Sequence, residues 1–332
     1  MKQKTALITA EFDPTGVSRL EELGYAVHLT GWGETRQALS SNALCRLMPG
    51  VSLLITEVEE VPAQVIDAAP DLQVIAVCRA RPVNVDLAAA TARGIPVLCT
   101  PGRNADSVAD FVVGLLLCLC RNISRAEHHL RSEGWMVAGN ELPYFHFRGP
   151  ELGGKTLGLI GYGAIGRALA RRLRGFDMRV LIYDPYVDQT NEGELISLET
   201  VLRNADIVSV HVPDTTETRG LLNADRLALM KPTAYLINTA RAAVVDEDAL
   251  FDALAFGRLA GAALDVFWDE PNISHRWFTL DNVLLTPHLG GAADGVKIHH
   301  SAIILDDLQA LSAGRMPTYL ANPEALRAED RH

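Results

Sequence analysis

The sequence predicts an α/β protein of two doubly wound domains, each built around a parallel β-sheet. Two observations lead to this fold class. Short apolar runs alternate with helical patterns, and the runs are apolar at nearly every position, as strands covered on both faces are. The alternation breaks near residue 100 and restarts near residue 155, and 332 residues are enough for two domains with separate cores.

Five strands are expected in the first hundred residues, at 5–10, 25–30, 51–56, 72–77 and 95–100. The segments 61–71 and 84–94 between them carry helical patterns and are expected to be crossover helices. A long apolar helix is expected from 104 to 121. Residues 134–149 are aromatic and irregular, which predicts an arm or loop.

Six further strands are expected in the second half of the chain, at 156–160, 179–183, 206–212, 234–239, 260–266 and 282–288. Helical patterns fall between most of them, so this half is a second αβ system. The tail from 292 to 314 has the pattern of one more amphipathic helix.

The composition is that of a globular protein, with 48% hydrophobic and 21% charged residues. Acidic residues outnumber basic ones by 41 to 30, and the net charge of −11 disfavours nucleic-acid or anionic-membrane partners.

The chain has no signal-peptide pattern and no apolar stretch of about 18–20 residues, so we expect a cytoplasmic protein without a membrane span. The five cysteines match no metal-binding spacing; we expect no metal site, and buried structural thiols at Cys45, Cys78, Cys99, Cys118 and Cys120.

A glycine-rich turn, GYGAIG, follows the predicted strand 156–160 and begins a helix. Gly161 permits the tight turn, Gly163 lets a pyrophosphate approach the backbone, and Gly166 lets the helix pack closely on the strand. The helix N-terminus offers free N–H groups and the positive end of a dipole to phosphates. This context predicts a dinucleotide site.

Asp184 ends the next predicted strand, 18 residues after Gly166. A carboxylate at this place accepts hydrogen bonds from the ribose hydroxyls and repels a 2′-phosphate. Pro185 and Tyr186 follow it where an arginine would accommodate that phosphate. NAD is therefore expected rather than NADP; the alternative is an ordinary aspartate at a strand end.

Three later motifs carry polar side chains that follow strands, at the edge where open α/β sheets place their sites. They are NTARAAVVD with Arg241, ALDVFWDEP with Glu270, and LTPHLGG with His288. Each residue alone has an ordinary structural interpretation: a surface cation, an acid in a turn before a proline, and a histidine packed in the core.

Taken together, these motifs resemble those of the D-isomer-specific 2-hydroxyacid dehydrogenase family, in its phosphoglycerate dehydrogenase-like branch, over nearly the whole chain. The matching segments are GYGAIG, Asp184, HVPDTTETRGL, LMKPTAYLINTARAAVVDEDAL, GAALDVFWDEP and TPHLGG. The resemblance implies that the family's catalytic Arg, Glu and His positions fall on Arg241, Glu270 and His288. It also implies further cofactor contacts, at Ala164, Ile165, Thr239, Asp265 and Gly291.

The resemblance also implies how the chain is organised. A Rossmann NAD-binding domain, residues 101–296, would be inserted in a flavodoxin-like substrate domain formed by residues 1–100 plus 297–332. Family members usually dimerise through the aromatic segment 134–149 and the helix before it, so a homodimer is expected.

The implied reaction is hydride transfer between NAD(H) and a 2-hydroxy or 2-oxo acid. Hydride leaves the carbon only as the hydroxyl proton is removed. Imidazole as a side-chain type, with an ordinary pKa of about 6.5, suits that step, and His288 would supply the imidazole. Glu270 would hydrogen-bond the other ring nitrogen, and the planar guanidinium of Arg241 can hold the substrate carboxylate through two hydrogen bonds.

Two alternatives to this enzyme are considered. One is a non-catalytic NAD(H)-sensing regulatory protein of the same fold, which has no need of an acid–base pair. The other is a formate-type dehydrogenase, whose histidine pairs with Gln where this chain has Glu270. The presence of Arg241, Glu270 and His288 together disfavours the sensor, and Glu270 disfavours the formate-type dehydrogenase.

The substrate end departs from the family pattern. Where members carry a glycine-rich GxGVDN-like loop, this chain has Arg79 and Arg81 at two glycine positions, whereas Asn84 remains. These three residues are candidate substrate-binding residues. We expect Arg79 or Arg81 to contact a polar or anionic tail of the substrate; the alternative is that both are solvated surface cations.

The segment after the third predicted strand bears on the substrate as well. Phosphoglycerate dehydrogenases commonly carry basic residues there, whereas this chain has Glu57, Glu59 and Glu60. Glutamates repel phosphate, which disfavours 3-phosphoglycerate relative to the other candidates. Those candidates are glyoxylate, hydroxypyruvate and longer sugar acids.

Two histidine pairs, at 128–129 and 299–300, lie on the polar faces of predicted helices. No spacing places them beside acids as a metal site. We expect them to be solvated or to lie at an interface.

Overall fold

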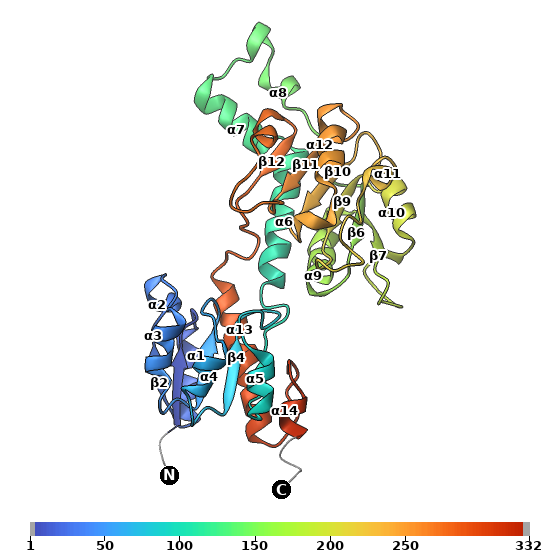
Figure 1. The fold of residues 1–332 in the computed structure, drawn as a ribbon. Helices are drawn as coiled ribbons and strands as arrows, with labels where there is room; N and C mark the ends of the chain where they lie inside the picture. The colour runs from blue at the N-terminus through green and yellow to red at the C-terminus, as the bar shows by residue number, and fades with distance from the viewer. Residues whose placement is uncertain (1–3, 328–332) are drawn as a thin grey trace. The chain divides into compact units, whose positions relative to one another are not determined.

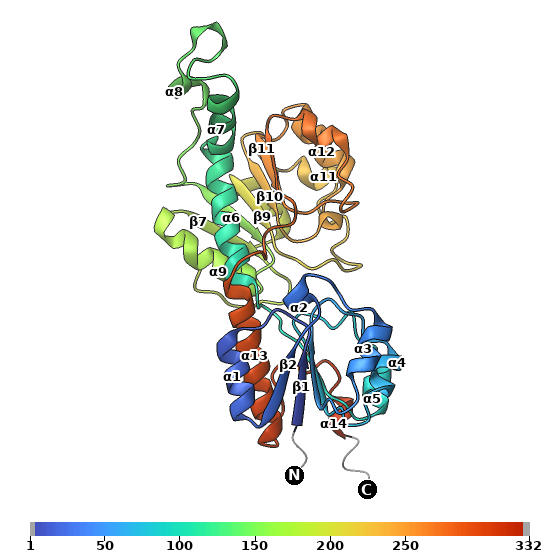
Figure 2. The same cartoon turned by 90° about the vertical axis from the view of Figure 1, so that its left-hand side faces the viewer.

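A computed structural model describes residues 4–327. The chain forms two compact units: unit 1 holds the residues up to Asn104 and those from Asp294 onward, and unit 2 holds Ala105–Ala293. Figures 1 and 2 show the blue helix α1 (Pro14–Glu22) and the orange-red helix α13 (Gly295–Ser312) side by side within unit 1. Unit 1 is therefore discontinuous in the sequence.

Unit 1 contains a five-stranded, entirely parallel sheet in the order β2-β1-β3-β4-β5. Its strands are β1 (Lys4–Ile8), β2 (Tyr25–Leu29), β3 (Leu53–Thr56), β4 (Val74–Val77) and β5 (Val97–Leu98). Each overlaps one of the predicted apolar runs. Every residue of β3 and β4 is buried, as expected for strands covered on both faces. The order is that of flavodoxin-like sheets, so this part of the predicted fold class is confirmed.

Helices cover both faces of the sheet in unit 1, as Figure 2 shows. They are α1 (Pro14–Glu22) and α13 (Gly295–Ser312) on one face, and α3 (Ser41–Leu47), α4 (Ala63–Asp67) and α5 (Leu87–Ala92) on the other. The short helices α2 (Trp32–Thr35) and α14 (Glu324–Arg327) complete the unit. Polar N-caps begin three of these helices, because the side chains of Asp13, Ser40 and Asp86 each accept a backbone N–H of the first turn.

Unit 2 contains a seven-stranded parallel sheet in the order β12-β11-β10-β9-β6-β7-β8. Its strands are β6 (Thr156–Ile160), β7 (Arg179–Tyr183), β8 (Glu194–Leu195), β9 (Ile207–Val210), β10 (Tyr235–Asn238), β11 (Gly261–Leu264) and β12 (Val283–Leu285). The six predicted strands are present; the two-residue edge strand β8 has no apolar run in the sequence and was not expected. The strand order reverses between β6 and β9, and in such sheets ligands bind beside the carboxyl ends of the strands at that point.

Helices also cover both faces of the sheet in unit 2. The helices on one face are α6 (Ala105–Cys120) and α9 (Ala164–Leu173), and those on the other are α10 (Leu198–Asn204), α11 (Ala224–Leu227) and α12 (Glu247–Ala255). Four 3₁₀ turns lie between or after these elements: η1 (Ala138–Asn140), η2 (Arg174–Phe176), η3 (Ala242–Val244) and η4 (His275–Thr279). α6 matches the long apolar helix that the sequence predicts.

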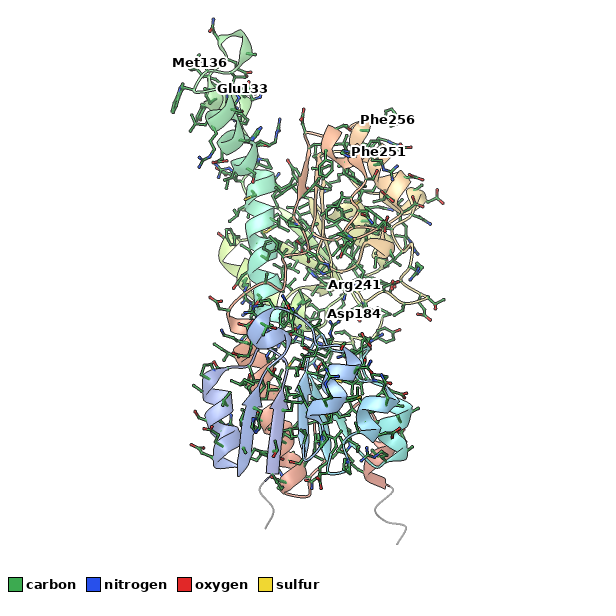
Figure 3. The ribbon with its side chains drawn as sticks, turned by 60° about the vertical axis from the view of Figure 1, so that its left-hand side comes forward. Glu133, Met136, Asp184, Arg241, Phe251 and Phe256 are labelled. Atoms are coloured by element: carbon green, nitrogen blue, oxygen red, sulfur yellow. The ribbon has the colours of Figure 1, made fainter. Side chains whose placement is uncertain are left out.

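An arm extends from the end of α6, away from the sheet of unit 2 (Figures 1 and 3). It contains α7 (Ile123–Ser132), the helix on which the sequence places His128 and His129, and α8 (Pro143–His146). Asn122 between α6 and α7 has φ 54° and ends the first helix. Aromatic side chains of the arm are exposed, among them Trp135 at 69% and Tyr144 at 78%.

Within the described residues, no single helix is long and apolar enough to cross a membrane. α6 and α7 meet the criteria of length and composition only when they are joined, and they are bent by 61° where they meet.

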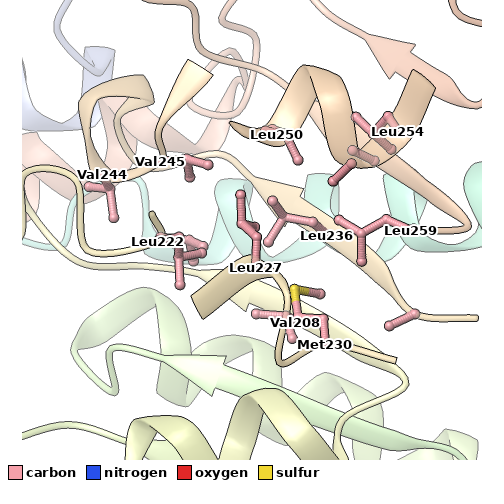
Figure 4. Packing of buried hydrophobic residues seen from close by; sticks show 14 of the residues in the cluster. Val208, Leu222, Leu227, Met230, Leu236, Val244, Val245, Leu250, Leu254 and Leu259 are labelled. Atoms are coloured by element: carbon pink, nitrogen blue, oxygen red, sulfur yellow. The ribbon is translucent and has the colours of Figure 1, made fainter. Parts of the chain in front are cut away.

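Figure 4 shows the core between the sheet of unit 2 and the helices α11 and α12. Val208 and Leu236 from the strands meet Leu227 and Met230 around α11 and Leu250 from α12. All five are at most 5% exposed, so this helical layer is fixed to the sheet by apolar packing. The loops that follow the strands are thereby held on a rigid base.

Candidate active site

The glycine turn between β6 and α9 has the geometry that its sequence predicts. Gly161 has φ 96°, and a Cβ there would lie 2.6 Å from the carbonyl oxygen of His211. A Cβ on Gly166 would lie 2.4 Å from the carbonyl oxygen of Gly161. Only glycine fits at either position. A Cβ on Gly163, by contrast, would meet nothing within 4 Å, so this N-cap of α9 is open to an approaching group.

The first turn of α9 and the end of β7 lie beside this glycine turn. Ala164 and Ile165 are the first two residues of α9, and the N–H groups of a first helical turn have no partner within the helix. Asp184, directly after β7, accepts hydrogen bonds from the backbone N–H of Tyr162 at 2.7 Å and of Tyr186 at 2.9 Å. The carboxylate is therefore tied to the glycine turn itself.

Thr239 and Gly291 follow β10 and β12. Thr239 is 8% exposed, and its buried hydroxyl has no hydrogen-bond partner among the described residues. A buried hydroxyl without a partner is costly unless a ligand satisfies it. Gly291 is half-buried in the turn after β12, where its carbonyl accepts the N–H of Ala293 at 3.1 Å. The open N-cap, the fixed Asp184 and the unsatisfied Thr239 together fit a dinucleotide.

Arg241 is presented by a turn that a buried asparagine organises. Asn238, the last residue of β10, is fully buried; its Oδ1 accepts the N–H of Ala240 at 3.0 Å and its Nδ2 donates to the carbonyl of Arg241 at 3.1 Å. The Arg241 side chain is exposed and donates only to the carbonyl of Ala240, at 2.6 Å, among the described residues. Most of its guanidinium donors therefore remain available to an anion.

Figure 3 shows that Asp184 and Arg241 lie at the same end of unit 2, and Phe256 at the opposite end. Asp184 follows β7 and Arg241 follows β10, so this end is the carboxyl edge of the parallel sheet. The glycine turn follows β6 and lies at this edge as well. This is the edge at which the strand order reverses, so the predicted cofactor residues and Arg241 are found together there.

His288 and Glu270 form a hydrogen-bonded pair. The His288 Nδ1 lies 2.8 Å from Oε2 of Glu270, whose Oε1 accepts the backbone N–H of Phe267 at 2.9 Å. The His288 side chain is 49% exposed and that of Glu270 is 38% exposed, so both face solvent. With Nδ1 engaged by the carboxylate, Nε2 is the ring nitrogen available to exchange a proton.

The electrostatics of Glu270 suit this pairing. Burial acts to raise the pKa of Glu270, but the hydrogen bonds from His288 and Phe267 and the positive charges of His288 and Arg241 outweigh it, so the pKa lies below the ordinary value. Glu270 is therefore a carboxylate at neutral pH and stabilises a positive charge on the imidazole. The charge of Arg241 acts on the same carboxylate, which links the three predicted catalytic residues.

Asp265, which the resemblance assigns to the cofactor, is engaged within the protein. It is 1% exposed; Oδ1 accepts from the Thr286 hydroxyl at 2.7 Å and the Leu289 N–H at 2.8 Å, and Oδ2 accepts the Gly290 N–H at 2.8 Å. These three bonds flank His288 and fix the turn that carries it, a role the sequence did not reveal. The sequence analysis also did not identify Asn238 and Thr286 as residues that position the site. The only local signal for them is that each is a polar residue at the end of a strand or directly after it.

The three candidate residues of the substrate loop in unit 1 have different surroundings. Arg79 is half-buried, and its Nε donates to the carbonyl of Glu57. Arg81 is exposed and has no side-chain hydrogen bond or ion pair among the described residues. Asn84 is 4% exposed and donates to the carbonyl of Glu59 at 2.7 Å, so its amide ties two loops together.

Potential metal-ligand side chains and the cysteine thiols have the following surroundings in the described part of the chain. Residues 4–327 contain no group of three or more His, Cys, Asp or Glu placed to hold a metal ion. All five cysteines are free; Cys78, Cys99 and Cys120 are buried, as predicted, whereas Cys45 and Cys118 are half-buried. Burial raises the pKa of Cys99 and of Cys120 to about 11, so these thiols stay protonated and unreactive at neutral pH.

Known proteins share both the sequence and the fold. Residues 113–290 match the family model described as D-isomer specific 2-hydroxyacid dehydrogenase, NAD binding domain. The chain is 40% identical over 337 residues to a glyoxylate reductase from Thermofilum pendens, covering 98% of this chain and 97% of that protein. The TT0316 protein of Thermus thermophilus has a crystal structure with a TM-score of 0.78 and 37% identity, covering 96% of this chain and 99% of that one.

A second solved structure carries a functional name. It is an NADPH-dependent glyoxylate/hydroxypyruvate reductase from Sinorhizobium meliloti, in complex with citrate. Its TM-score is 0.77 with 30% identity, and the match covers 97% of this chain and 98% of that one. The match extends over both parallel-sheet units, so it includes more than the dinucleotide-binding part of the fold.

Proposed function

Because the chain belongs to the D-isomer-specific 2-hydroxyacid dehydrogenase family and is an oxidoreductase that uses a nicotinamide cofactor, we propose that it reduces a small 2-oxo acid to the 2-hydroxy acid with NADH, or catalyses the reverse oxidation. The observation that carries the proposal is the His288–Glu270 pair, 2.8 Å apart, whose carboxylate also experiences the charge of Arg241. A proton donor and an anion-binding guanidinium are the two groups that the reaction requires from the protein.

In the reduction, Arg241 binds the substrate carboxylate through its guanidinium and draws electron density from the adjacent carbonyl. The protonated His288 donates the Nε2 proton to the carbonyl oxygen while the carbonyl carbon accepts hydride. Glu270 stabilises the imidazolium before transfer and holds the neutral ring afterwards. A bound nicotinamide supplies the hydride, and it accepts one in the reverse direction.

The same proposal assigns the cofactor contacts to unit 2 and the substrate contacts beyond the reacting carbon to Arg79, Arg81 and Asn84 of unit 1. The cofactor set is Gly161, Gly163, Ala164, Ile165, Gly166, Asp184, Thr239, Asp265 and Gly291. The open N-cap at Gly163 and the unsatisfied hydroxyl of Thr239 support it. Asp265, whose oxygens already bind three protein groups, reaches the cofactor only by sharing these bonds.

NAD is the proposed cofactor because Asp184 is held in place as a carboxylate. Two backbone N–H groups fix it beside the glycine turn, so it cannot move away from a 2′-phosphate. The relative from Sinorhizobium meliloti is named for NADPH, so cofactor choice varies among similar proteins. Asp184→Ala should lower the preference for NADH over NADPH by about tenfold or more in kcat/KM.

Glyoxylate and hydroxypyruvate are the proposed substrates to test first, because relatives are named for them. Absorbance of NADH at several 2-oxo acid concentrations measures turnover by the wild type and by His288→Gln. The variant should bind NADH normally and lose at least about a thousandfold in kcat. Tight NADH binding by the wild type without turnover of any 2-oxo acid or 2-hydroxy acid would favour the sensor instead.

A homodimer is also proposed. The arm after α6 exposes Trp135, Tyr144 and Phe145 at 69%, 78% and 58%, more apolar surface than one segment of a monomer usually presents. We propose that a second copy of the chain covers this surface. Light scattering of the wild type and of Tyr144→Glu measures the molar mass in solution.

The free cysteines fit a reducing, cytoplasmic location, which stays a prediction.

A further inference from the structure

The turns that carry Arg241 and Glu270 follow neighbouring strands of the sheet in unit 2. Arg241 lies three residues after β10 and Glu270 six residues after β11, and the two strands pair in parallel. The strand pairing fixes where each turn begins, but both side chains lie beyond the paired residues. Their spacing is fixed only if further contacts join the two turns.

Trp268 makes such a contact. It lies two residues before Glu270, and its indole N–H donates to the carbonyl oxygen of Val245 at 2.9 Å. Val245 is 1% exposed and ends the 3₁₀ turn η3, which begins directly after Arg241. One hydrogen bond therefore joins the Glu270 turn to the Arg241 turn.

Both sides of this hydrogen bond are held by other contacts. On one side, Leu222 exchanges two backbone hydrogen bonds with residues 244–246, at 2.9 and 3.0 Å. On the other side, the backbone N–H of Phe267 donates to Oε1 of Glu270 at 2.9 Å, so the residue before Trp268 binds the carboxylate directly. A shift of Trp268 therefore moves one turn relative to the other.

An aromatic stack holds the indole of Trp268 in place. Its ring is nearly parallel to that of Trp277, with 5.5 Å between the ring centroids and an interplanar angle of 6°. Trp277 is 1% exposed, and its own indole N–H donates to Oε1 of Glu247 at 3.2 Å. Glu247 is the first residue of α12, the helix that follows the Arg241 turn. Both tryptophans thus donate to the same stretch of chain.

We propose that Trp268 is a positioning residue, whose hydrogen bond to Val245 fixes the spacing of the two turns that the reaction uses. The inference rests on the proposed function, in which Arg241 holds the substrate carboxylate while His288, the partner of Glu270, protonates the carbonyl oxygen. Both contacts are made to one small molecule, so the two turns must stand at one spacing. A displacement of about 1 Å can lower the rate of such a reaction about a hundredfold.

Trp268→Phe tests the hydrogen bond, because it keeps an aromatic ring against Trp277 and removes the N–H donor. With saturating NADH and glyoxylate or hydroxypyruvate, kcat should fall about tenfold, and KM for the 2-oxo acid should change less than about twofold. The reason is that the guanidinium still binds the substrate carboxylate, whereas the carbonyl oxygen is misplaced relative to His288.

Trp268→His is the converse variant. Its imidazole superimposes on the five-membered ring of an indole, so Nε2–H stands at the place of the indole N–H. The six-membered ring is lost, and with it part of the stacking area on Trp277. This variant should unfold at a lower urea concentration than Trp268→Phe and yet have the higher kcat. A residue that served packing alone would give the opposite order of kcat.

Phe251→Leu is the matched control for lost packing. Phe251 belongs to α12 and packs edge-on against Trp277, with 5.6 Å between the ring centroids. Figure 3 shows it on the Phe256 side of unit 2, away from Arg241. Its replacement should lower the urea midpoint of unfolding and leave kcat within about twofold of the wild type.

A double-mutant cycle identifies the residue through which Trp268 acts. In an Arg241→Gln background the guanidinium is already absent, so Trp268→Phe should change kcat/KM less than about twofold. The pH dependence of kcat in Trp268→Phe should keep the wild-type midpoint, because the variant retains the hydrogen bond between His288 and Glu270.

The outcomes separate this inference from the proposed function. The positioning role is overturned if Trp268→Phe keeps the wild-type kcat or shifts the pH midpoint, or if Trp268→His has the lower kcat of the two variants. It is also overturned if Phe251→Leu loses as much kcat, or if the losses in the double variant are additive. The dehydrogenase stands in all of these cases. Absence of NADH-dependent reduction of every 2-oxo acid by the wild type overturns both proposals.

Discussion

The carboxyl edges of the two sheets hold their charged side chains in different ways. In unit 2, His288 and Glu270 are about half exposed, and their turns are fixed by hydrogen bonds from residues no more than about 25 positions away. In unit 1, Glu57, Arg103 and His300 are nearly buried and come from three distant parts of the sequence. In the proposed reaction, the groups of the first edge exchange a proton and bind an anion. The groups of the second edge are held by their contacts with one another.

This difference has an energetic consequence. Exposed ion pairs add little to stability, whereas removing one partner of a buried pair leaves a charge without solvent or counter-charge. Substitutions at the edge of unit 2 should therefore change activity far more than stability. Substitutions within the buried network of unit 1 should change stability as well.

The largest effect is expected for Arg241→Gln. Loss of the guanidinium should lower kcat/KM for glyoxylate or hydroxypyruvate by about a thousandfold, equivalent to about 4 kcal/mol of transition-state stabilisation. The melting temperature should stay within about 2 °C of the wild type, because the side chain is exposed. Steady-state kinetics and thermal unfolding measure the two quantities. If the free energy of unfolding fell by as much as the transition-state stabilisation, the two edges would not differ in the way described.

A smaller effect, on stability, is expected for Arg103→Met. The variant leaves the Glu57 side chain, 12% exposed, without its ion pair and should lower the free energy of unfolding by about 2–3 kcal/mol. Arg179→Met is the matched control, since its pair with Glu194 joins side chains that are 62% and 54% exposed, and it should cost no more than about 0.5 kcal/mol. Urea denaturation measures both. Similar losses in the two variants would show that burial does not distinguish the pairs.

The stability of the protein should also depend on pH through a buried histidine of unit 1. Burial lowers the pKa of His300 to about 4, with a smaller contribution of the same sign from the charge of Arg103. The unfolded chain, with an ordinary value of 6.5, binds the proton more readily, so stability is full above that pH and is lost as the pH falls toward 4.

Between pH 7 and pH 5 the wild type should therefore lose about 2 kcal/mol through His300. His300→Gln should lack this part of the loss. Burial also lowers the pKa of His211 to about 4, and because His211 is unchanged in the variant, the difference between the two proteins isolates His300. Denaturant titrations at both pH values give the comparison, and equal losses would mean that His300 does not titrate as a buried group.

Much of the fold follows from local patterns in the sequence. Uniformly apolar runs predict both parallel sheets, because strands covered on two faces have no polar side. The edge strand β8 was missed, because its two residues, Glu194–Leu195, form no apolar run. Helix α7 was predicted only as a helical polar face that carries His128 and His129, without bounds, and none of its residues is buried.

The site residues also divide into those that local sequence patterns predict and those that they do not. Arg241, Glu270 and His288 are predictable because each stands in a short motif after a strand. The prediction that His300 is solvated or interfacial was wrong, since its ring is 1% exposed and lies 3.2 Å from Arg103, a contact that spans 197 residues. Glu57 was expected only to repel phosphate, and no local pattern indicated its partner. Contacts between distant segments depend on the fold and leave no spacing in the sequence.

The most direct test of the central claim is the pH dependence of kcat/KM for NADH-dependent hydroxypyruvate reduction, in the wild type and in Glu270→Gln. Glu270 has a pKa below its ordinary value and is ionised throughout the range of the assay. If His288 donates the proton and Glu270 stabilises its charged form, the wild-type rate falls as the pH rises, and the fall begins at lower pH in the variant. Superimposable profiles for the two proteins would contradict the account.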